Sequence, residues 1–148
     1  MVCGARCLAV LISHVLPEQL DLVWNELEPQ IMRGLTHGQG DECYPELMKA
    51  QILNERMQLW AIQDEEQREL RAGVVVSVRD SKTRKVWVEL LAGENIDEWA
   101  SDLEDTLRTF KERVGASTIE ASCRLGLAKY LQSRGTGWKR KAIVMELT

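Results

Sequence analysis

The sequence predicts a mixed α/β domain in which helices lie on both faces of a central, mostly antiparallel sheet, giving three layers. Two observations support this class. Three consecutive strand-like segments between residues 57 and 91 are joined by short polar turns, as in an antiparallel meander. An apolar strand then runs through a glycine into an amphipathic helix. The expected element order is β-α-α-β-β-β-α-β-α-β, and we expect residues 1–148 to form one domain.

The first three elements are a strand and two helices. Arg6–His14 is apolar enough to be a buried strand. Pro17 is suited to open a helix whose apolar residues recur at helical spacing, and Pro29 should kink or end that helix early. The glycine-rich residues 34–41 predict a loop. A second helix is expected over Pro45–Arg56, because proline suits the first turn of a helix.

The middle of the chain has the period of strands. The expected strands are Met57–Gln63, Ala72–Asp80 and Lys85–Leu91, and charged turns at residues 64–68 and 81–84 separate them. Strands joined by such tight turns pair in antiparallel order, which is why we expect a meander.

The most informative pattern follows the third of these strands. The strand runs through the loop Ala92–Asn95 into a helix expected over Ile96–Val114. Asn95 and Glu98 stand at the start of this helix with the spacing of a capping box, in which asparagine would be the cap. A helix start after a glycine presents unpaired backbone N–H groups and a positive dipole end. This arrangement is suited to a phosphorylated ligand.

The same helix start has an alternative interpretation. Glu94, Asp97 and Glu98 are carboxylates that complement the helix dipole by themselves and would repel phosphate groups. An ordinary capped helix start therefore stays open beside the ligand site.

The C-terminal part predicts a strand, a helix and a last strand. Gly115 ends the long helix, and the strand Thr118–Cys123 follows. A helix is expected over Leu125–Ser133, closed by Gly135. Ala142–Leu147 is the expected last strand, and its edge could pair with a second copy, so we expect a monomer or a homodimer.

Charge and composition exclude several classes of function. The net charge of −4 argues against a general nucleic-acid or membrane binder. The small basic clusters at residues 82–85 and 139–141 are expected to be solvated surface. The four cysteines have no CxxC spacing and the two histidines are far apart, so no metal site is expected. No apolar segment has the length of a membrane span, and a cytoplasmic location is expected.

Six segments follow one another along the chain: Trp24, Gly38–Asp41, Arg56–Ile62, Ala72–Asp80, Leu90–Trp99 and Ile119–Gly135. This ordered set resembles the GNAT superfamily of N-acetyltransferases across the chain, and more specifically the small GNAT-like proteins of tailed bacteriophages. The resemblance implies an acyl-CoA-dependent N-acetyltransferase with acetyl-CoA as the donor and an unknown acceptor.

The resemblance also implies where acetyl-CoA would bind. The pantetheine arm would lie against the strand backbone over Glu89–Ala92, where the fourth strand parts from the fifth. The pyrophosphate would lie on the loop at the start of the next helix. The loop departs from the family pattern, because Gly93 is its only glycine and no Arg or Gln precedes it. The implied cofactor-binding residues are Leu90, Leu91, Ala92, Gly93, Glu94, Asn95, Ile96 and Arg124.

Two residues are the implied catalytic candidates. Glu89 lies on the fourth strand, on the same face as Trp87 and Leu91 if the strand alternates regularly, and a raised pKa there would suit a general base. Tyr130 is the candidate acid, although it lies one residue before the family position and is otherwise a packing or surface tyrosine. Glu120 is a second, weaker base candidate, and Arg124 could pair with it.

Further residues have simpler interpretations. The five tryptophans fall one per element and are expected to be core residues, and His37 is expected to be a solvated loop residue. The alternative function is a catalytically inactive GNAT-fold phage protein that acts by binding a host or virion protein. In that case the location would be the host cytoplasm.

Overall fold

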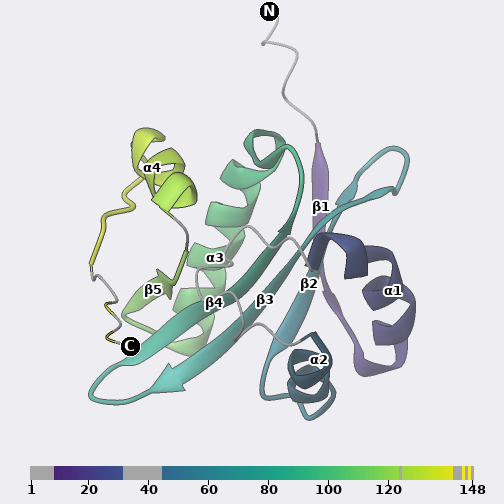
Figure 1. Cartoon of the computed structure of the whole chain (residues 1–148), viewed down its shortest axis with the longest axis horizontal. Helices are drawn as coiled ribbons and strands as arrows, with labels where there is room; N and C mark the ends of the chain where they lie inside the picture. The colour runs from purple at the N-terminus through teal and green to yellow at the C-terminus, as the bar shows by residue number, and fades with distance from the viewer. Residues whose placement is uncertain (1–8, 32–44, 124, 142–144, 146, 148) are drawn as a thin grey trace, which may run out of the picture.

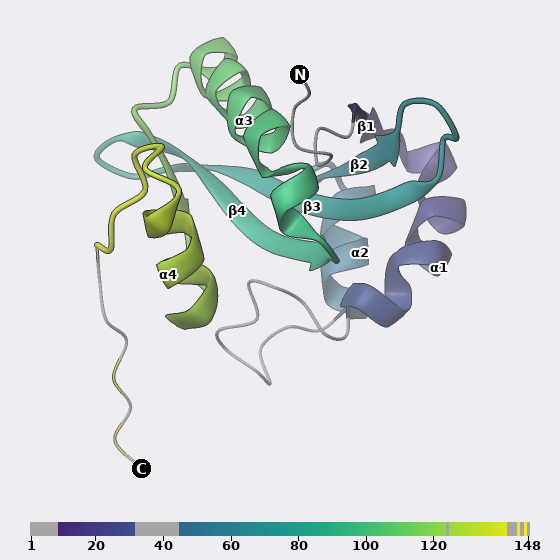
Figure 2. The same ribbon diagram turned by 90° about the horizontal axis from the view of Figure 1, so that it is seen from above.

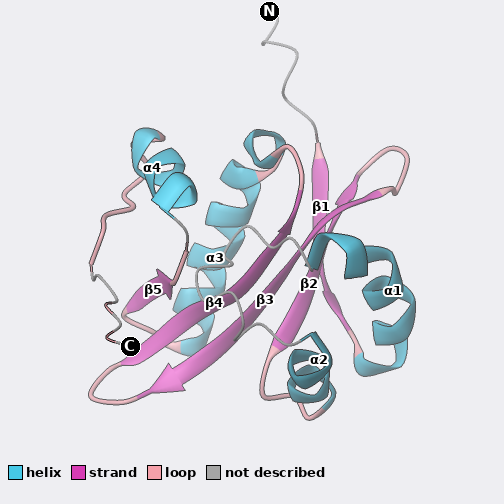
Figure 3. Ribbon diagram, in the orientation of Figure 1, coloured by secondary structure: helices cyan, strands magenta, loops and turns pink. Residues whose placement is uncertain are grey.

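The computed structural model describes residues 9–31, 45–123, 125–141, 145 and 147. These residues form one five-stranded sheet in the order β1-β2-β3-β4-β5, with helices on both faces (Figure 1). The strands are β1 Val10–Val15, β2 Gln58–Asp64, β3 Leu70–Asp80, β4 Arg84–Gly93 and β5 Thr118–Ala121. The first four strands pair in antiparallel order, and β5 pairs parallel to β4 (Figure 3). The predicted fold class and meander are confirmed.

The helices form the outer layers. Their bounds are α1 Leu20–Ile31, α2 Pro45–Leu53, α3 Ala100–Val114 and α4 Leu125–Ser133, with 3₁₀ turns at Pro17–Gln19 and Ile96–Glu98. Helices α1 and α2 cover one face of the sheet and α3 covers the other (Figure 2). The predicted bounds of α4 are confirmed, because the apolar period and the left-handed Gly135 both mark its end.

Each face of the sheet has its own apolar cluster. Trp24 and Leu27 of α1 pack on Leu59 and Val75, on the α1 face. The cluster on the other face joins α3 to the strands and includes the fully buried Trp99. Trp24, Trp60 and Trp99 are core residues as expected, but Trp87 and Trp138 are only partly buried.

Strand β1 is not the buried strand that its composition predicts. It lies at the edge of the sheet, and Leu11 is 37% exposed. An edge strand has one open side, so part of an apolar strand stays accessible to water. Residues 6–8 of the expected strand lie outside the described part of the chain.

The ends of α1 and α2 differ from those predicted. Pro17 opens a 3₁₀ turn, and the α-helix begins only at Leu20. Pro29 does not end α1, because Leu27 and Ile31 are both buried against the sheet and hold the last turn in place. Helix α2 ends before the predicted residue 56 because Glu55 has a left-handed φ of 60°.

Several predictions fall on residues that the structure does not describe. They are the loop at residues 34–41 with His37, the cysteines Cys3, Cys7 and Cys43, Arg124, and most of the expected strand Ala142–Leu147. Within the described residues, no helix is both long and apolar enough to cross a membrane.

Candidate functional site

The candidate site begins where β4 and β5 stop pairing. The parallel register runs from Lys85 opposite Thr118 to Val88 opposite Ala121, where β5 ends. Strand β4 continues past this point to Gly93. The two strands therefore form a wedge, which we define as the space beyond the Val88–Ala121 pair. This is the parting of the fourth and fifth strands that the resemblance implied.

The wedge contains a narrow apolar cavity of about 30 Å³. Val88 and Leu91 line it from β4, Ala121 lines it from β5, and Leu127 and Leu131 line it from α4. Residues of α3 close the remaining wall. The cavity has room for roughly two water molecules, so an acyl group fits inside it and a longer chain would extend outside.

The loop between β4 and α3 does not have the predicted capping box. Asn95 has left-handed angles of φ 55° and ψ 50°, and its side chain makes no capping hydrogen bond. Residues 96–98 form a 3₁₀ turn, and α3 begins at Ala100. The physical reason is Trp99, whose buried indole donates a hydrogen bond of 2.9 Å to the carbonyl of Glu94 and pulls the turn onto the core.

Gly93 is fixed by contact with the neighbouring strand. Its φ is +151°, and a Cβ added there would lie 2.5 Å from the Cβ of Ala72 and 2.9 Å from the carbonyl of Arg71. The glycine is therefore required for the close approach of β3 and β4, whatever else the loop does.

Replacing Gly93 with alanine should lower the free energy of unfolding by about 2 kcal/mol, because β3 must move to make room for the methyl group. Urea denaturation measures this change. Gly126→Ala is the matched control, since Gly126 has open space around it in α4. Equal unfolding midpoints for Gly93→Ala and the wild type would contradict the prediction.

The charge of the loop does not fit a pyrophosphate. Glu94, Asp97 and Glu98 lie between Gly93 and α3, and the sequence has no Lys or Arg from residue 86 to residue 107. Three carboxylates repel a phosphate group more strongly than a helix dipole attracts it. Arg124, the cation that the sequence analysis placed near this loop, lies outside the described residues.

A β-bulge places the base candidate Glu89. The β3–β4 register shifts so that Val75 faces Leu90 while Val76 faces Val88. Glu89 is the extra residue on β4, and a bulge of this kind turns a side chain out of the regular alternation.

The bulge corrects the predicted alternation. Leu90 packs in the α1-face cluster, whereas Leu91 packs in the α3-face cluster with Val88. Leu91 therefore does not share a face with Trp87 and Glu89, as regular alternation predicted. Glu89 and Trp87 do lie on one face, because Arg79 contacts both of them.

Glu89 is held by two side chains of β3. Its Oε1 and Oε2 accept hydrogen bonds of 3.0 and 2.9 Å from Nη2 of Arg79. Its Oε2 also accepts a short hydrogen bond from the hydroxyl of Ser77. The side chain of Glu89 is 11% exposed, while that of Arg79 is 52% exposed. Glu89 is thus held in place by Ser77 and by an ion pair with the solvent-accessible guanidinium of Arg79.

Tyr130 lies on α4 and does not hydrogen-bond to Glu89 in the described structure. Its hydroxyl accepts a hydrogen bond of 3.4 Å from Nη1 of Arg134, and the guanidinium lies 5.8 Å from its ring centroid. An accepting hydroxyl keeps its own proton available for donation.

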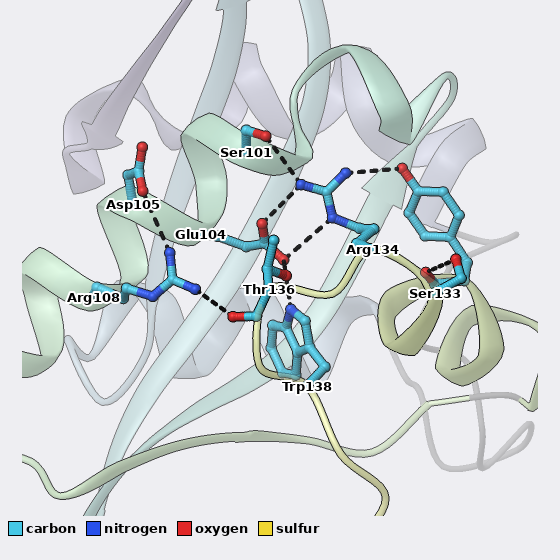
Figure 4. Close-up of polar contacts among 9 residues, drawn as sticks. Ser101, Glu104, Asp105, Arg108, Ser133, Arg134, Thr136 and Trp138 are labelled. Atoms are coloured by element: carbon cyan, nitrogen blue, oxygen red, sulfur yellow. Dashed lines mark hydrogen bonds and ion pairs between the residues drawn. The ribbon is translucent and has the colours of Figure 1, made fainter.

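A polar network that the sequence did not predict joins α3 to the segment after α4 (Figure 4). Glu104 is buried, and its carboxylate accepts hydrogen bonds from Arg134 at 2.8 Å, Thr136 at 2.8 Å and Trp138 at 2.6 Å. Arg134 also donates to Ser101 at 3.0 Å. Because Glu104 and Trp138 line the cavity as well, the network fixes one wall of the wedge.

The network sets the charge state of Glu104. Burial opposes ionisation, but the hydrogen bonds from Arg134, Thr136 and Trp138 outweigh it and hold the pKa of Glu104 below its usual value. The hydrogen bond to Glu104 in turn raises the pKa of Arg134, so both groups are ionised near neutral pH.

Glu120, the second base candidate, is paired with two lysines. Its Oε2 lies 2.7 Å from Nζ of Lys141 and 3.3 Å from Nζ of Lys85. The hydrogen bond from Lys141 is the main cause of the lowered pKa of Glu120, against the opposing effect of burial. Lys85 and Lys141 belong to the two basic clusters, so part of each cluster is ion-paired.

Among the residues that the structure describes, the remaining His, Cys, Asp and Glu side chains form no metal site. Cys123 is a half-buried free cysteine, and burial raises the pKa of its thiol. Across the described residues, no group of three or more His, Cys, Asp or Glu side chains could hold a metal ion.

Comparison with known proteins supports the fold. No protein-family model matches the sequence, and no curated protein matches it. Solved structures do match. The ribosomal-protein-alanine N-acetyltransferase of Brucella melitensis biovar Abortus 2308 has a TM-score of 0.65 at 12% identity, covering 94% of this chain and 100% of that chain.

Two further structures are similar over nearly the whole chain. A predicted acetyltransferase of Clostridium acetobutylicum, described with acetyl-CoA, has a TM-score of 0.63 at 14% identity, covering 95% of this chain and 96% of that chain. The glucosamine-6-phosphate N-acetyltransferase of Arabidopsis thaliana has a TM-score of 0.61 at 11% identity, covering 95% and 98%. Identity this low establishes the fold alone. The chain has the GNAT fold of these acetyltransferases.

Proposed function

We propose that the protein is an N-acetyltransferase that takes its acyl group from acyl-CoA at the wedge between β4 and β5. The observation that supports this proposal is the parting of the two strands beside an apolar cavity. Glu89 lies on the face of β4 opposite the cavity-lining Val88 and Leu91, so in this proposal the acyl group reaches Glu89 through the wedge. The apolar lining fits the acyl-thioester end of the donor.

The residues of the site have distinct roles in this proposal. The acceptor nitrogen attacks the thioester carbonyl carbon, the C–N bond forms and the C–S bond breaks. Glu89 takes the proton that the amine loses, once Arg79 has moved from its carboxylate. Tyr130 gives its hydroxyl proton to the leaving thiolate, and Arg134 beside it stabilises the resulting phenolate.

The pyrophosphate end of the donor has no corresponding site among the described residues. The carboxylates of the loop Glu94–Glu98 do not fit it. We therefore place only the acyl and pantetheine parts of the donor, along Leu90, Leu91 and Ala92, and assign no phosphate contact to Gly93, Asn95 or Ile96. Arg124 is the residue implied for that contact.

Filling the wedge tests the proposal. Replacing Ala121 with leucine adds three carbons at the cavity and should weaken acetyl-CoA binding about tenfold or more, measured by isothermal titration calorimetry. Ala50→Leu is the matched control, because Ala50 is exposed on α2, on the opposite face of the sheet. Circular dichroism verifies that both variants fold. A wild-type protein that gives no heat with acetyl-CoA or CoA would refute donor binding.

A second function has its own support. Glu89 is ion-paired with Arg79, and the loop carries three carboxylates where a donor phosphate would lie. Both observations favour a GNAT fold without catalysis, which would act by binding another protein, in a phage by binding a host or virion protein. This function predicts no CoA binding and co-purification with a host enzyme or with phage particles. A pull-down from infected cells that returns neither would count against it.

A further inference from the structure

The bulged region of β4 holds a cation on an aromatic ring. The guanidinium carbon of Arg79 lies 4.2 Å from the ring centroid of Trp87, and its Nη2 is 2.9 Å from Oε2 of Glu89. Ser77, directly opposite Trp87 in the β3–β4 register, fixes Glu89 from the other side. The β3–β4 hairpin that carries these residues extends beyond α1 and α2 (Figure 1).

An aromatic face beside a carboxylate is a recognition site for an organic cation. The ring attracts the cation through its quadrupole, and the carboxylate supplies the counter-charge. Here the two recognising groups are the more buried partners, since the Glu89 side chain is 11% exposed and Trp87 is partly buried. The occupant is the more mobile partner, because Arg79 has a long side chain that is 52% exposed.

The neighbouring charges already have partners. On the far side of Trp87, β5 places Glu120 in register with it, and Lys85 and Lys141 neutralise that carboxylate. Arg84, also on the hairpin, pairs with Asp80. Of the cations around Trp87, Arg79 is therefore the one that contacts its ring.

We propose that Trp87, Glu89 and Ser77 form the binding site for the cationic amine of the acceptor, and that Arg79 occupies this site as an internal competitor. The proposal rests on the proposed function and names its acceptor class, a primary ammonium group on an accessible side chain or small molecule. Moving Arg79 aside would uncover the Trp87 ring and release the Glu89 carboxylate, so that the same event admits the acceptor and frees the base.

The tethered guanidinium has a consequence that a binding experiment can measure. A tethered competitor acts at a high effective concentration, so the unaltered protein should bind a free amine weakly. Replacing Arg79 with methionine keeps an aliphatic stem on Trp87 and removes the charge. The dissociation constant for n-butylammonium should then fall about tenfold.

The measurement is NMR titration of the Trp87 indole N–H signal, assigned by comparison with Trp87→Phe, with n-butylammonium as the probe and n-butanol as its neutral counterpart. Arg84→Met is the matched control, because Arg84 is also a half-exposed, carboxylate-paired arginine of the hairpin and should bind as the wild type does. Adding Glu89→Gln to Arg79→Met should abolish the gain, and n-butanol should produce no saturable shift.

Two results would overturn the proposal: equal dissociation constants for the wild type and Arg79→Met, or no saturable shift in Arg79→Met at all. The same samples are then titrated with acetyl-CoA. Tight butylammonium binding without acetyl-CoA binding would refute the proposed function and leave the cation site standing, so the two failures are distinguishable.

Discussion

Replacing Glu104 with alanine is expected to lower the free energy of unfolding by about 3 kcal/mol, because it leaves a largely buried arginine without its counter-ion. The side chain of Arg134 is 15% exposed, and that of Glu104 is 6% exposed. Thr136 and Trp138 lose their acceptor as well. For a chain of this length, the thermal midpoint should fall by roughly 6–12 °C.

Differential scanning calorimetry measures this shift, and Asp105→Ala is its control. Asp105 is the next carboxylate on α3 and pairs with Arg108, but its side chain is 78% exposed. An exposed pair contributes at most about 1 kcal/mol. Equal melting points for the two variants would show that the Glu104 network contributes nothing beyond a surface ion pair.

The contribution of Glu104 should also depend on pH. Its pKa is lower in the folded state than in the unfolded chain, where a glutamate titrates at about 4.3. The stabilisation is therefore complete above that value and is lost as the pH falls through the lower pKa of the folded state. Below about pH 4, the thermal midpoint of Glu104→Gln should consequently decrease less steeply with decreasing pH than that of the wild type.

The elements that follow local rules could be predicted from the sequence. The sequence predicts helix α4 with its observed bounds because its apolar residues recur at helical spacing and Gly135 closes it. The three meander strands, β2 to β4, were found because alternation and polar turns are both local signals.

Features that depend on distant contacts could not be predicted. Nothing in the segment 85–93 marks Glu89 as a bulge residue, because a bulge depends on the register with β3. The start of α3 differs from the predicted one because buried Trp99, rather than the local capping pattern, decides the path of the loop.

The Glu104 network also depends on contacts between residues distant in the sequence, but one feature of the sequence indicates it. Its partners follow it by 30 to 34 residues. Yet Glu104 falls in the apolar stripe formed by Ala100, Leu103 and Leu107 on α3. A carboxylate within an apolar stripe needs a buried partner, and this rule could have identified it.

Replacing Glu89 with glutamine is expected to lower kcat for amine acetylation about 100-fold or more, the size of effect that general-base residues produce. The amide keeps an oxygen that can accept from Ser77 or Arg79, so folding should be retained. Thiol release from acetyl-CoA measures the rate. Asp80→Asn is the matched control, because Asp80 is an exposed, arginine-paired carboxylate on the same hairpin.

The pH profile separates loss of the base from loss of structure. Without Glu89, only acceptor molecules that have already lost their proton in solution can react. The acetylation rate of Glu89→Gln should therefore rise about tenfold per pH unit up to the amine pKa of about 10.4. The wild-type rate should stop rising at a lower pH. If the pH profile of Glu89→Gln instead had the wild-type shape at a lower rate, the substitution would have disturbed the positioning of the reacting groups. Arg79→Met should raise the wild-type rate but leave that of Glu89→Gln unchanged, because Arg79 restrains the reaction through this carboxylate.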